Sequence, residues 1–441
     1  MSLRRLAYTI VIYLLTPIVL LRLLWRSIKS PQYRQRIAER FGYINDISVE
    51  GPIWIHAVSV GEFIAAVPLI KKVMQQYPEH KILITTTTPT GSARVKDIFA
   101  NQIGHQVEHC YLPYDLPGSV SRFLNKTKPC LALIMETEIW PNLFAAVNKK
   151  NIPLYIANAR LSKKSMLGYQ KFPALVGEAL ANVDHICARD DSDCERFQTL
   201  IFDEGVNEGA DEVSKVSATG NIKFDIKIDE AQIEAGREFK NKVLGKGRKV
   251  LVAASTHAGE DEKVLNAFNM LLKEYPDLQL LIVPRHPERF ATVAELCEGE
   301  GFEVVTRSSG MSAKEVPVYI GDSMGEMLLY FAASDVAFIG GSLVPVGGHN
   351  MLEAMAIGVP VISGAHVHNF QDIAENMVAR TAGFLVDDEN ELAKKAAELL
   401  GSKELAQRMV ANAKQFLEDN RGAIDAIIGR IALSLDKDQK G

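Results

Sequence analysis

The 441-residue sequence is poor in the residues that build disulfide frameworks and zinc sites. Its five cysteines are odd in number, are scattered and form no C-x-x-C pair. That pattern argues against structural disulfides and metal-thiolate clusters and is typical of a reducing compartment. Positive charge is not in excess either. The 49 Lys and Arg residues stand against 54 Asp and Glu residues, a net charge of −5, which argues against nucleic acid as the principal partner.

The usual markers of two nucleotide-dependent reactions are also missing. The stretch "FIGGSLVPVGGHNMLEAMAIGVPVI" (338–362) contains neither G-x-G-x-x-G nor the lysine-serine pair of a P-loop, so it does not support hydride transfer or ATP hydrolysis. No D-x-D pair stands beside it, and we expect no metal ion and no cofactor. The pattern predicts a strand, a glycine-rich loop and a helix. Main-chain N–H groups of such a loop are expected to approach a phosphate, with a tight turn as the alternative.

The composition is that of a globular protein, with 47% hydrophobic and 23% charged residues, and the length suggests two or three domains. From about residue 45 to 225, short apolar β-rich runs alternate with helical patterns, and the alternation returns from about 231 to 400. Such runs predict parallel sheets covered by helices on both faces. We therefore expect an α/β protein of two doubly wound, Rossmann-like domains facing a central cleft, in which ligands bind beyond the carboxyl ends of the strands.

We divide the chain into a membrane anchor with a basic flank (1–30), a first domain (31–225), a second domain (226–402) and a helical tail (403–441). The anchor is predicted from Ala7–Leu21, which carries no charge, and from the apolar run that continues to Trp25. These helices span about 22 and about 28 Å against a hydrocarbon core of ~30 Å, so spanning and interfacial placements both stay open. A cleaved signal peptide is disfavoured because no small-x-small site follows. Basic residues after the run predict that the bulk of the chain is cytoplasmic.

Carboxylates gather at predicted strand ends in the first domain. Ser59 and Glu62 fit an S-x-x-E capping box, so Glu62 either caps the following helix or takes a proton from a substrate, and the two roles are compatible. Glu136 and Glu138, in "IMETEIWPN", are expected to face the same side after a strand, with helix N-terminal charge as the alternative. Lys223, in "TGNIKFD", is expected to reach into the cleft unless it is an ordinary exposed lysine.

Polar residues also end predicted strands in the second domain. Arg285, in "LIVPRHPERF", suits a bidentate grip on a phosphate or carboxylate, with a surface arginine as the alternative. Glu353, one turn into the helix after the glycine-rich loop, is placed to accept hydrogen bonds from ribose hydroxyls. In "IGDSMGEMLLYF", the acidic and hydroxyl residues before the helix are also explained by ordinary capping.

Ten stretches, in order, resemble the 3-deoxy-D-manno-oct-2-ulosonic acid (Kdo) transferases of Gram-negative bacteria. They are "HAVSVGE", "TTTTPTGSARV", "YLPYDLP", "IMETEIWPN", "IANARLS", "GNIKFD", "ASTHAGE", "VPRHPERF", "GDSMGEM" and "GGSLVPVGGHNMLEA". The similarity spans nearly the whole chain, including the N-terminal anchor, and only the part beyond about residue 400 lacks a distinctive match.

The resemblance implies an inverting GT-B glycosyltransferase. It would move Kdo from CMP-Kdo to the lipid A precursor lipid IVA in lipopolysaccharide core biosynthesis, without a metal, on the cytoplasmic side of the cell inner membrane and in contact with membrane lipid. A UDP-sugar transferase or epimerase of the same fold is the alternative. Matched by motif, Glu62 becomes the catalytic base, and Glu136 and Lys223 the transition-state stabilisers. The implied donor-binding residues are Pro284, Arg285, Met324, Gly325, Glu326, Asn350, Met351, Leu352 and Glu353.

The chemistry of this reaction accounts for these residue types. CMP is a good leaving group, whereas the acceptor hydroxyl must lose its proton as it attacks. A carboxylate at a helix N-terminus is expected to stay ionised at neutral pH, which would make Glu62 available as a base contributing about 10²–10⁴ in rate. Lys223 and Arg285 are expected to balance the negative charge of the donor carboxylate or of the departing CMP.

Overall fold

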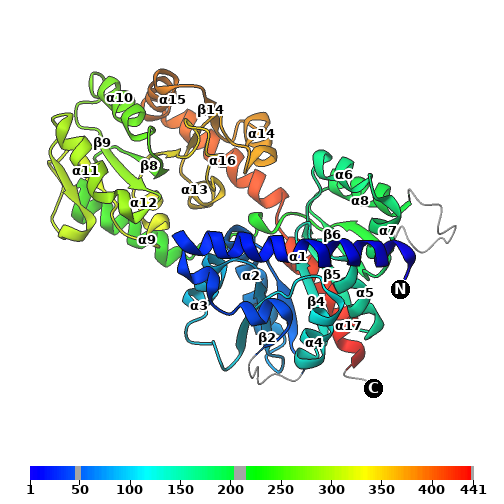
Figure 1. Ribbon diagram of the computed structural model, residues 1–441. Helices are drawn as coiled ribbons and strands as arrows, with labels where there is room; N and C mark the ends of the chain where they lie inside the picture. Colours follow the sequence, from blue (N-terminus) through cyan, green and yellow to red (C-terminus); the bar gives the residue numbers. More distant parts are fainter. Residues whose placement is uncertain (45–50, 203–214, 439–441) are drawn as a thin grey trace. The chain divides into compact units, whose positions relative to one another are not determined.

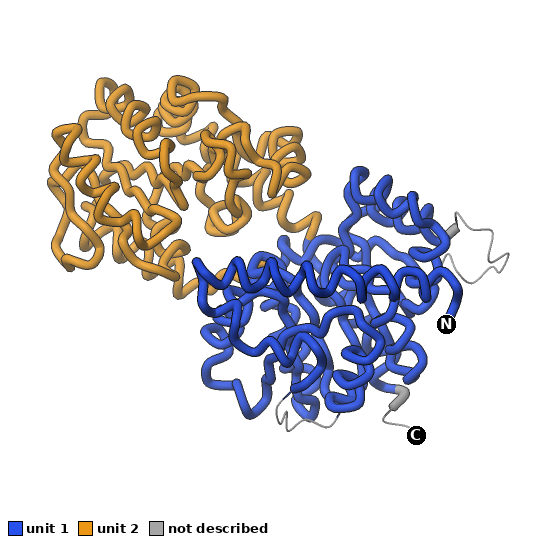
Figure 2. Tube along the Cα trace, in the orientation of Figure 1, with its two compact units in different colours: residues 1–225, 421–441 blue, residues 226–420 orange. Residues whose placement is uncertain are grey.

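The computed structural model describes residues 1–44, 51–202 and 215–438, and the chain forms two compact units (Figure 2). Unit 1 comprises residues 1–225 and 421–441, and unit 2 comprises residues 226–420. The predicted tail from residue 403 is therefore not one segment. Helix α16 (Lys403–Asp419) belongs to unit 2, where Met409 enters the core, whereas α17 (Ala423–Asp438) returns to unit 1, where Ile427 is buried.

Within the described residues, unit 1 contains a seven-stranded parallel sheet in the order β3-β2-β1-β4-β5-β6-β7. Alternate residues of a strand face opposite sides, so Ile53 and Ile55 enter one apolar layer and Trp54 enters the other. The strands are β1 (Ile53–His56), β2 (Ile82–Thr86), β3 (Val107–Tyr111), β4 (Leu131–Met135), β5 (Leu154–Ala159), β6 (His185–Ala188) and β7 (Val216–Ala218).

Helices cover both faces of this sheet, as the apolar runs predicted (Figure 1). Helices α2, α3 and α17 pack into one layer, and α4, α5, α7 and α8 into the other. Four of the helices begin with proline, whose fixed φ suits the first helical turn. The bounds are α2 (Val60–Gln76), α3 (Pro89–Ile98), α4 (Pro117–Thr127), α5 (Pro141–Lys149), α6 (Lys163–Tyr169), α7 (Pro173–Ala181) and α8 (Asp191–Phe202).

Unit 2 repeats this architecture, with a parallel sheet in the order β10-β11-β9-β8-β12-β13-β14. The predicted strands are present, and the edge strand β14 was not predicted because its apolar run, Phe384–Val386, is only three residues long. The strands are β8 (Val250–Thr256), β9 (Gln279–Pro284), β10 (Val304–Thr306), β11 (Val318–Ile320), β12 (Val336–Ile339), β13 (Val361–Gly364) and β14 (Phe384–Val386). The helices are α9 (Glu230–Phe239), α10 (Asp261–Leu272), α11 (Phe290–Gly299), α12 (Met327–Ala332), α13 (Leu352–Ile357), α14 (Gln371–Ala379), α15 (Glu389–Gly401) and α16.

Each sheet has one place where its strand order reverses. In unit 1 the chain moves outward from β1 through β2 to β3 and then resumes at β4 on the other side of β1. In unit 2 the same reversal lies between β8 and β12. Ligands of doubly wound sheets bind beyond the carboxyl ends of the strands at such switch points. The fold therefore marks one candidate site in each unit.

Helix α1 (Leu3–Lys29) is, within the described part of the chain, the one helix long and apolar enough to cross a membrane. It contacts α5 and α7 of unit 1 (Figure 1). The Tyr8 hydroxyl donates to Asp115 Oδ2 over 3.0 Å, and the Thr9 hydroxyl donates to Asn142 Oδ1 over 3.1 Å. The N-terminal part of the helix is thus tied to the unit. Large apolar residues are exposed along the whole helix, and they include a row spaced three or four positions apart, formed by Ile10, Leu14, Ile18, Leu21, Trp25 and Ile28.

Candidate active site

Glu62 lies in the first turn of α2, directly after the switch-point strand β1. Its main-chain N–H donates to the Ser59 hydroxyl oxygen over 3.2 Å, so the capping serine is in place. Its carboxylate accepts the Val58 N–H at Oε2 and the Ser59 hydroxyl at Oε1, each over 2.9 Å. These contacts hold the carboxylate in a fixed orientation at the carboxyl edge of the sheet. Capping geometry and an available carboxylate coexist at this residue, as the sequence allowed.

The electrostatic surroundings of Glu62 differ from the expectation. The helix N-terminus was expected to favour the ionised form, and the hydrogen bonds from Val58 and Ser59 do lower its pKa. Burial, followed by the negative charge of Glu136, acts in the opposite direction and outweighs them, so the pKa of Glu62 is raised above its ordinary value. The prediction of a stabilised anion was therefore wrong in direction. A carboxylate with a raised pKa binds a proton more strongly and is a better general base.

Two further glutamates follow β4, the neighbour of β1. Glu136 has φ of 60°, a left-handed conformation that is uncommon for a residue other than glycine and that often marks a functional site. The strand ends at Met135, so the argument that Glu136 and Glu138 share a strand face does not apply. Burial, then the charge of Glu62, raises the pKa of Glu138 to about 7. Three carboxylates therefore influence one another at this switch point, and sequence reasoning did not select Glu138 for the site.

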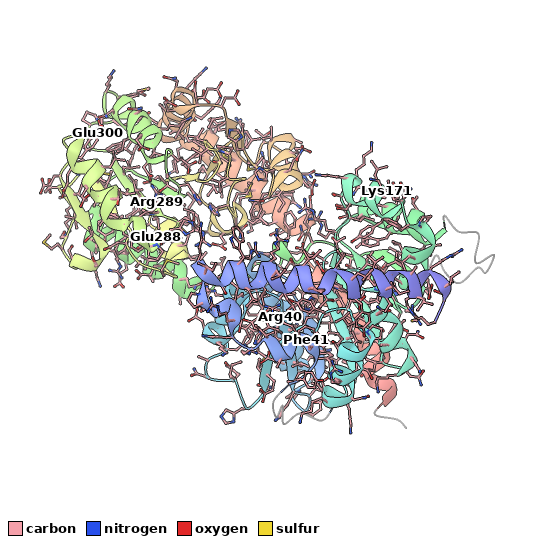
Figure 3. All side chains as sticks on the ribbon, viewed as in Figure 1. Arg40, Phe41, Lys171, Glu288, Arg289 and Glu300 are labelled. Carbon is pink, nitrogen blue, oxygen red and sulfur yellow. The ribbon has the colours of Figure 1, made fainter. Side chains whose placement is uncertain are left out.

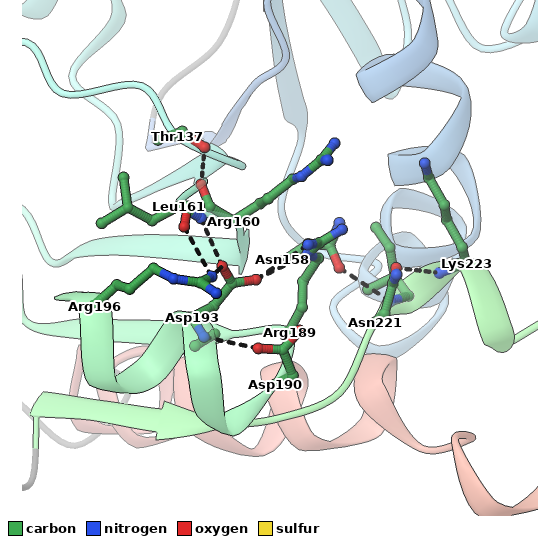
Figure 4. Close-up of polar contacts among 12 residues, drawn as sticks. Thr137, Asn158, Arg160, Leu161, Arg189, Asp190, Asp193, Arg196, Asn221 and Lys223 are labelled. Atoms are coloured by element: carbon green, nitrogen blue, oxygen red, sulfur yellow. Dashed lines mark hydrogen bonds and ion pairs between the residues drawn. The ribbon is translucent and has the colours of Figure 1, made fainter. Parts of the chain in front are cut away.

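Lys223 lies on a short 3₁₀ helix, η4 (Ile222–Phe224), which packs against α2. Two asparagines hold this turn in place (Figure 4). The buried Asn158, itself at φ of 52° at the end of β5, accepts the Ile222 N–H over 3.1 Å. The side chain of Asn221 accepts the Lys223 N–H over 3.1 Å. The lysine predicted from "GNIKFD" is thus placed by a short turn anchored to both the sheet and α2.

A buried carboxylate organises the arginines beside this turn. Asp193, 0% exposed, accepts the Leu161 N–H over 2.8 Å and forms ion pairs with Arg189 and Arg196 (Figure 4). It thereby fixes the segment that follows β5. Asp193 was not predicted, because a lone aspartate in the first turn of a helix resembles an ordinary cap.

In unit 2, the glycine-rich loop binds a carboxylate of the protein itself. The N–H groups of Gly341, Ser342 and Leu343 donate to the carboxylate of Glu260 over 2.6–3.0 Å. Glu260 is 0% exposed, and its side chain also accepts the His257 N–H. The N–H groups of Gly347 and Gly348 donate to the Gly341 carbonyl. The prediction that these N–H groups cradle a phosphate is therefore wrong, and Glu260, which the sequence analysis missed, takes that place.

The predicted donor residue Glu326 is also engaged within the protein. Arg307 donates two hydrogen bonds to its carboxylate, over 2.9 and 2.8 Å, and the Ser323 hydroxyl donates a third over 2.5 Å. The hydrogen bonds from Arg307 lower the pKa of Glu326 to about 2. Glu326 therefore shapes its loop as a permanent anion. In the same loop, Gly325 adopts φ of 85°, and Met324 is 59% exposed.

The remaining predicted donor residues lie after β9 and at the start of α13. Pro284 ends β9 and is buried, and the half-buried Arg285 follows it. At α13, the Asn350 amide donates to Glu353 Oε1 over 3.0 Å, and its carbonyl oxygen accepts the Leu352 N–H over 3.2 Å. Burial raises the pKa of Glu353.

Met351 and Leu352 are both 0% exposed. Neither side chain is therefore available to contact a ligand. The predicted catalytic residues lie in unit 1 and the predicted donor residues in unit 2, and the cleft between the units stays a prediction.

Comparisons with known proteins agree with this division. Residues 35–226 match the family described as 3-Deoxy-D-manno-octulosonic-acid transferase (kdotransferase), and residues 238–416 match Glycosyl transferases group 1. A UDP-GlcNAc 2-epimerase from Neisseria meningitidis, solved with UDP-GlcNAc, shares the fold at 16% identity, with a TM-score of 0.54, covering 88% of this chain and 100% of its own.

Two relatives of similar length show the family to which the chain belongs. A 3-deoxy-D-manno-octulosonic acid transferase from Haemophilus influenzae is 41% identical over 98% of this chain and 99% of its own. One from Bordetella pertussis is 34% identical over 94% of this chain and 96% of its own. The switch points of the two units thus belong to a glycosyltransferase, and the chain is a member of the 3-deoxy-D-manno-octulosonic acid transferase family.

Proposed function

We propose that this enzyme transfers Kdo from CMP-Kdo to a sugar hydroxyl of lipid IVA with inversion, and that Glu62 is the general base. The observation that carries the proposal is the state of Glu62, which is held at the switch point by two hydrogen bonds while burial and Glu136 raise its pKa. As the acceptor hydroxyl attacks the anomeric carbon, its proton passes to Glu62, and the carbon–oxygen bond to CMP breaks with its electron pair going to the phosphate. A single displacement of this kind inverts the anomeric carbon.

The other predicted residues stabilise charge in this scheme. Lys223, placed by Asn158 and Asn221, supplies a cation on the same unit as the base. Glu136, held in a left-handed conformation, acts through its charge on Glu62. In unit 2, Arg285 and the main chain of the α13 entry hold CMP. Fixed cations and dipoles of this kind stabilise a departing phosphate without reorganising during the reaction.

Turnover tests the activity directly. Detergent-solubilised full-length protein, incubated with CMP-Kdo and lipid IVA, should release CMP and increase the mass of the lipid by one or more Kdo units. The anomeric configuration of the product, measured by NMR, should be opposite to that of the donor. Folded protein that releases no CMP would contradict the proposal. CMP should raise the melting temperature and UDP should not, and the reverse result would favour the UDP-sugar alternative.

We also propose that the protein sits on the cytoplasmic face of the inner membrane with α1 in the interface, serving lipopolysaccharide synthesis. Tyr8 and Thr9 tie the start of α1 to buried polar residues of unit 1, a contact that a helix crossing the bilayer would have to break. The opposite face carries apolar residues for lipid. A cysteine at exposed Leu3 should react with a membrane-impermeant reagent from the cytoplasmic side, as should one at Ser30. Labelling of the Leu3 position only from the other side would show a spanning helix.

A further inference from the structure

Three histidines meet at the switch point of unit 2, and the transfer reaction as described above does not use them. His257 follows β8, His286 follows β9 and His349 follows β12, which are three adjacent strands of the sheet. The Nε2 atoms of His257 and His349 lie 2.8 Å apart, with their rings stacked at 9° and 5.0 Å between centroids. The His286 ring stands edge-on to His257 at 5.3 Å. The imidazole pair therefore bridges the reversal between β8 and β12.

The backbone is shaped to admit this pair. Gly341 has φ of 70°, and a Cβ atom at that position would lie 3.1 Å from His349 Nε2 and 3.4 Å from His257 Cδ2. The carboxylate of Glu260 holds the same loop and also accepts the His257 N–H. A side chain at residue 341 would therefore press on both rings. The glycine at residue 341 and the carboxylate of Glu260 thus leave room for the two imidazoles to contact each other.

The surroundings of the pair are mainly cationic. Arg285, His286 and Arg289 act on His257 from the segment after β9, and Asp261 at the start of α10 opposes them. Arg289, labelled in Figure 3, donates to the Thr256 carbonyl over 2.9 Å and pairs with Asp261. The other nearby acid, Glu260, is held by the N–H groups of His257 and of the loop.

Burial is nevertheless the largest cause that lowers the pKa of both imidazoles, with the neighbouring cations adding to it, and the pKa of His349 falls to about 4. The free pair is therefore neutral at pH 7.

A neutral imidazole pair joined through Nε2 can accept one proton and no more. One ring donates its Nε2–H to the other, and a proton added to Nδ1 of the donor ring leaves that hydrogen bond intact. A second proton would place two N–H groups against each other at 2.8 Å. The dianionic phosphate monoester of CMP would compensate the cost of the first proton, because opposite charge raises the pKa of an imidazole.

We propose that His257 and His349 form a phosphate subsite that binds the phosphoryl group of the nucleotide and takes up one proton from solvent as it does so. This inference rests on the proposed use of a cytidine nucleotide. Arg285 supplies the fixed charge of the subsite, and the imidazole pair supplies a charge that exists only while the anion is bound. The pair thus acts as a positioning and charge-matching element for the phosphate.

Calorimetry on the detergent-solubilised full chain tests the proposal. CMP binding is measured at pH 7.5 in two buffers of different ionisation enthalpy, and the difference counts the protons taken up. Wild-type protein should take up close to one proton with CMP and none with cytidine, and free Kdo serves as a carboxylate probe. Affinity for CMP should fall as the pH rises from 7 to 9.

His257→Gln and His349→Gln keep a hydrogen-bonding side chain but cannot titrate. Each should lose the proton uptake and bind CMP roughly tenfold more weakly at pH 7, the scale of one charge-assisted hydrogen bond, with no change for cytidine. His366→Gln, an exposed histidine of the same unit outside this cluster, should behave as wild type. Melting curves establish that each variant is folded.

The possible failures are distinct. CMP binding without proton uptake, equal in wild type and both variants, would overturn the subsite and leave the proposed function standing. Proton uptake with Kdo but not with CMP would assign the pair to a carboxylate instead. A folded wild-type protein that does not bind CMP would overturn the proposed function and the subsite together.

Discussion

Unit 1 and unit 2 share a sheet topology but surround their switch points with side chains of opposite character. In unit 1, burial and the charge of neighbouring glutamates raise the pKa of Glu62 and of Glu138. In unit 2, Arg289 pairs with Asp261 and Arg307 pairs with Glu326, and Arg307 lowers the pKa of Glu326 to about 2. Crowded carboxylates favour taking up a proton, whereas a compensated, cationic edge favours holding an anion. In the mechanism proposed above, the same fold would supply a base from one unit and a phosphate site from the other.

The largest effect is expected at the base. Glu62→Gln keeps the cap from Ser59 and the size of the side chain but cannot accept a proton, so kcat should fall by about 10²–10⁴. The rate of CMP release measures it, and a melting curve shows that the fold is retained. Glu79→Gln, at an exposed position beyond the other end of α2, is the matched control. A Glu62→Gln variant with nearly normal kcat would show that Glu62 is not the base, and unit 1 could then no longer be called the proton-accepting unit.

The second largest effect is expected at the buried Glu260 side chain of unit 2. In Glu260→Gln, an NH₂ group replaces one oxygen and faces two N–H donors, so the loop at Gly341–Leu343 loses hydrogen bonds and gains a repulsion. Leaving buried donors without acceptors should cost about 2–4 kcal/mol of folding stability and weaken CMP binding with it. Thermal unfolding and CMP titration measure the two quantities. Glu262→Gln, exposed in the same first turn of α10, should change neither.

This contrast also separates what the sequence reveals from what it does not. The strands, the covering helices and the position of Glu62 follow from local patterns, because apolar runs and capping boxes act over a few residues. Glu138 and Glu260 act through partners far away in the sequence. The pKa of Glu138 depends on Glu62, and Glu260 bonds residues that lie about 80 positions further along.

Local sequence patterns also gave wrong predictions for the 340–348 loop and for the helices after residue 402, because the partners of both depend on distant contacts. The glycines of the 340–348 loop suggested a phosphate cradle, yet their N–H groups are satisfied inside the fold. The helices after residue 402 suggested one tail, yet α17 packs on the core of unit 1. In both cases the sequence pattern specifies a local conformation, and tertiary contacts decide its partner.

A smaller effect concerns the pH dependence of unit 1. Glu138 has a pKa raised from the ordinary 4.5 to about 7. The unfolded chain therefore releases this proton at lower pH than the folded protein, so the residue lowers folding stability as the pH rises from about 4.5 to 7. The side chain of Glu138→Gln does not titrate. The difference in folding stability between this variant and wild type should therefore shift in favour of the variant, by on the order of 1–3 kcal/mol, when the pH is raised from 4.5 to 8. Melting temperatures at both pH values test this expectation. An equal gain in Glu79→Gln would show that the stabilisation does not come from the glutamates at the switch point of unit 1.

The smallest effect is expected where unit 2 compensates an acid at its surface. Arg307→Met keeps much of the aliphatic length but removes both hydrogen bonds to Glu326, whose pKa should rise toward its ordinary range. The pair is about one-third exposed, so solvent screens much of the lost attraction and the fold should hold. The loop that carries Met324 and Gly325 loses its anchor, and the KM for CMP-Kdo should rise by about tenfold with little change in kcat. Arg237→Met, an exposed arginine of α9, is the control. A drop in kcat at unchanged KM would mean that this loop acts on the chemical step, and the division between a proton-accepting unit and an anion-holding unit would then have to be redrawn.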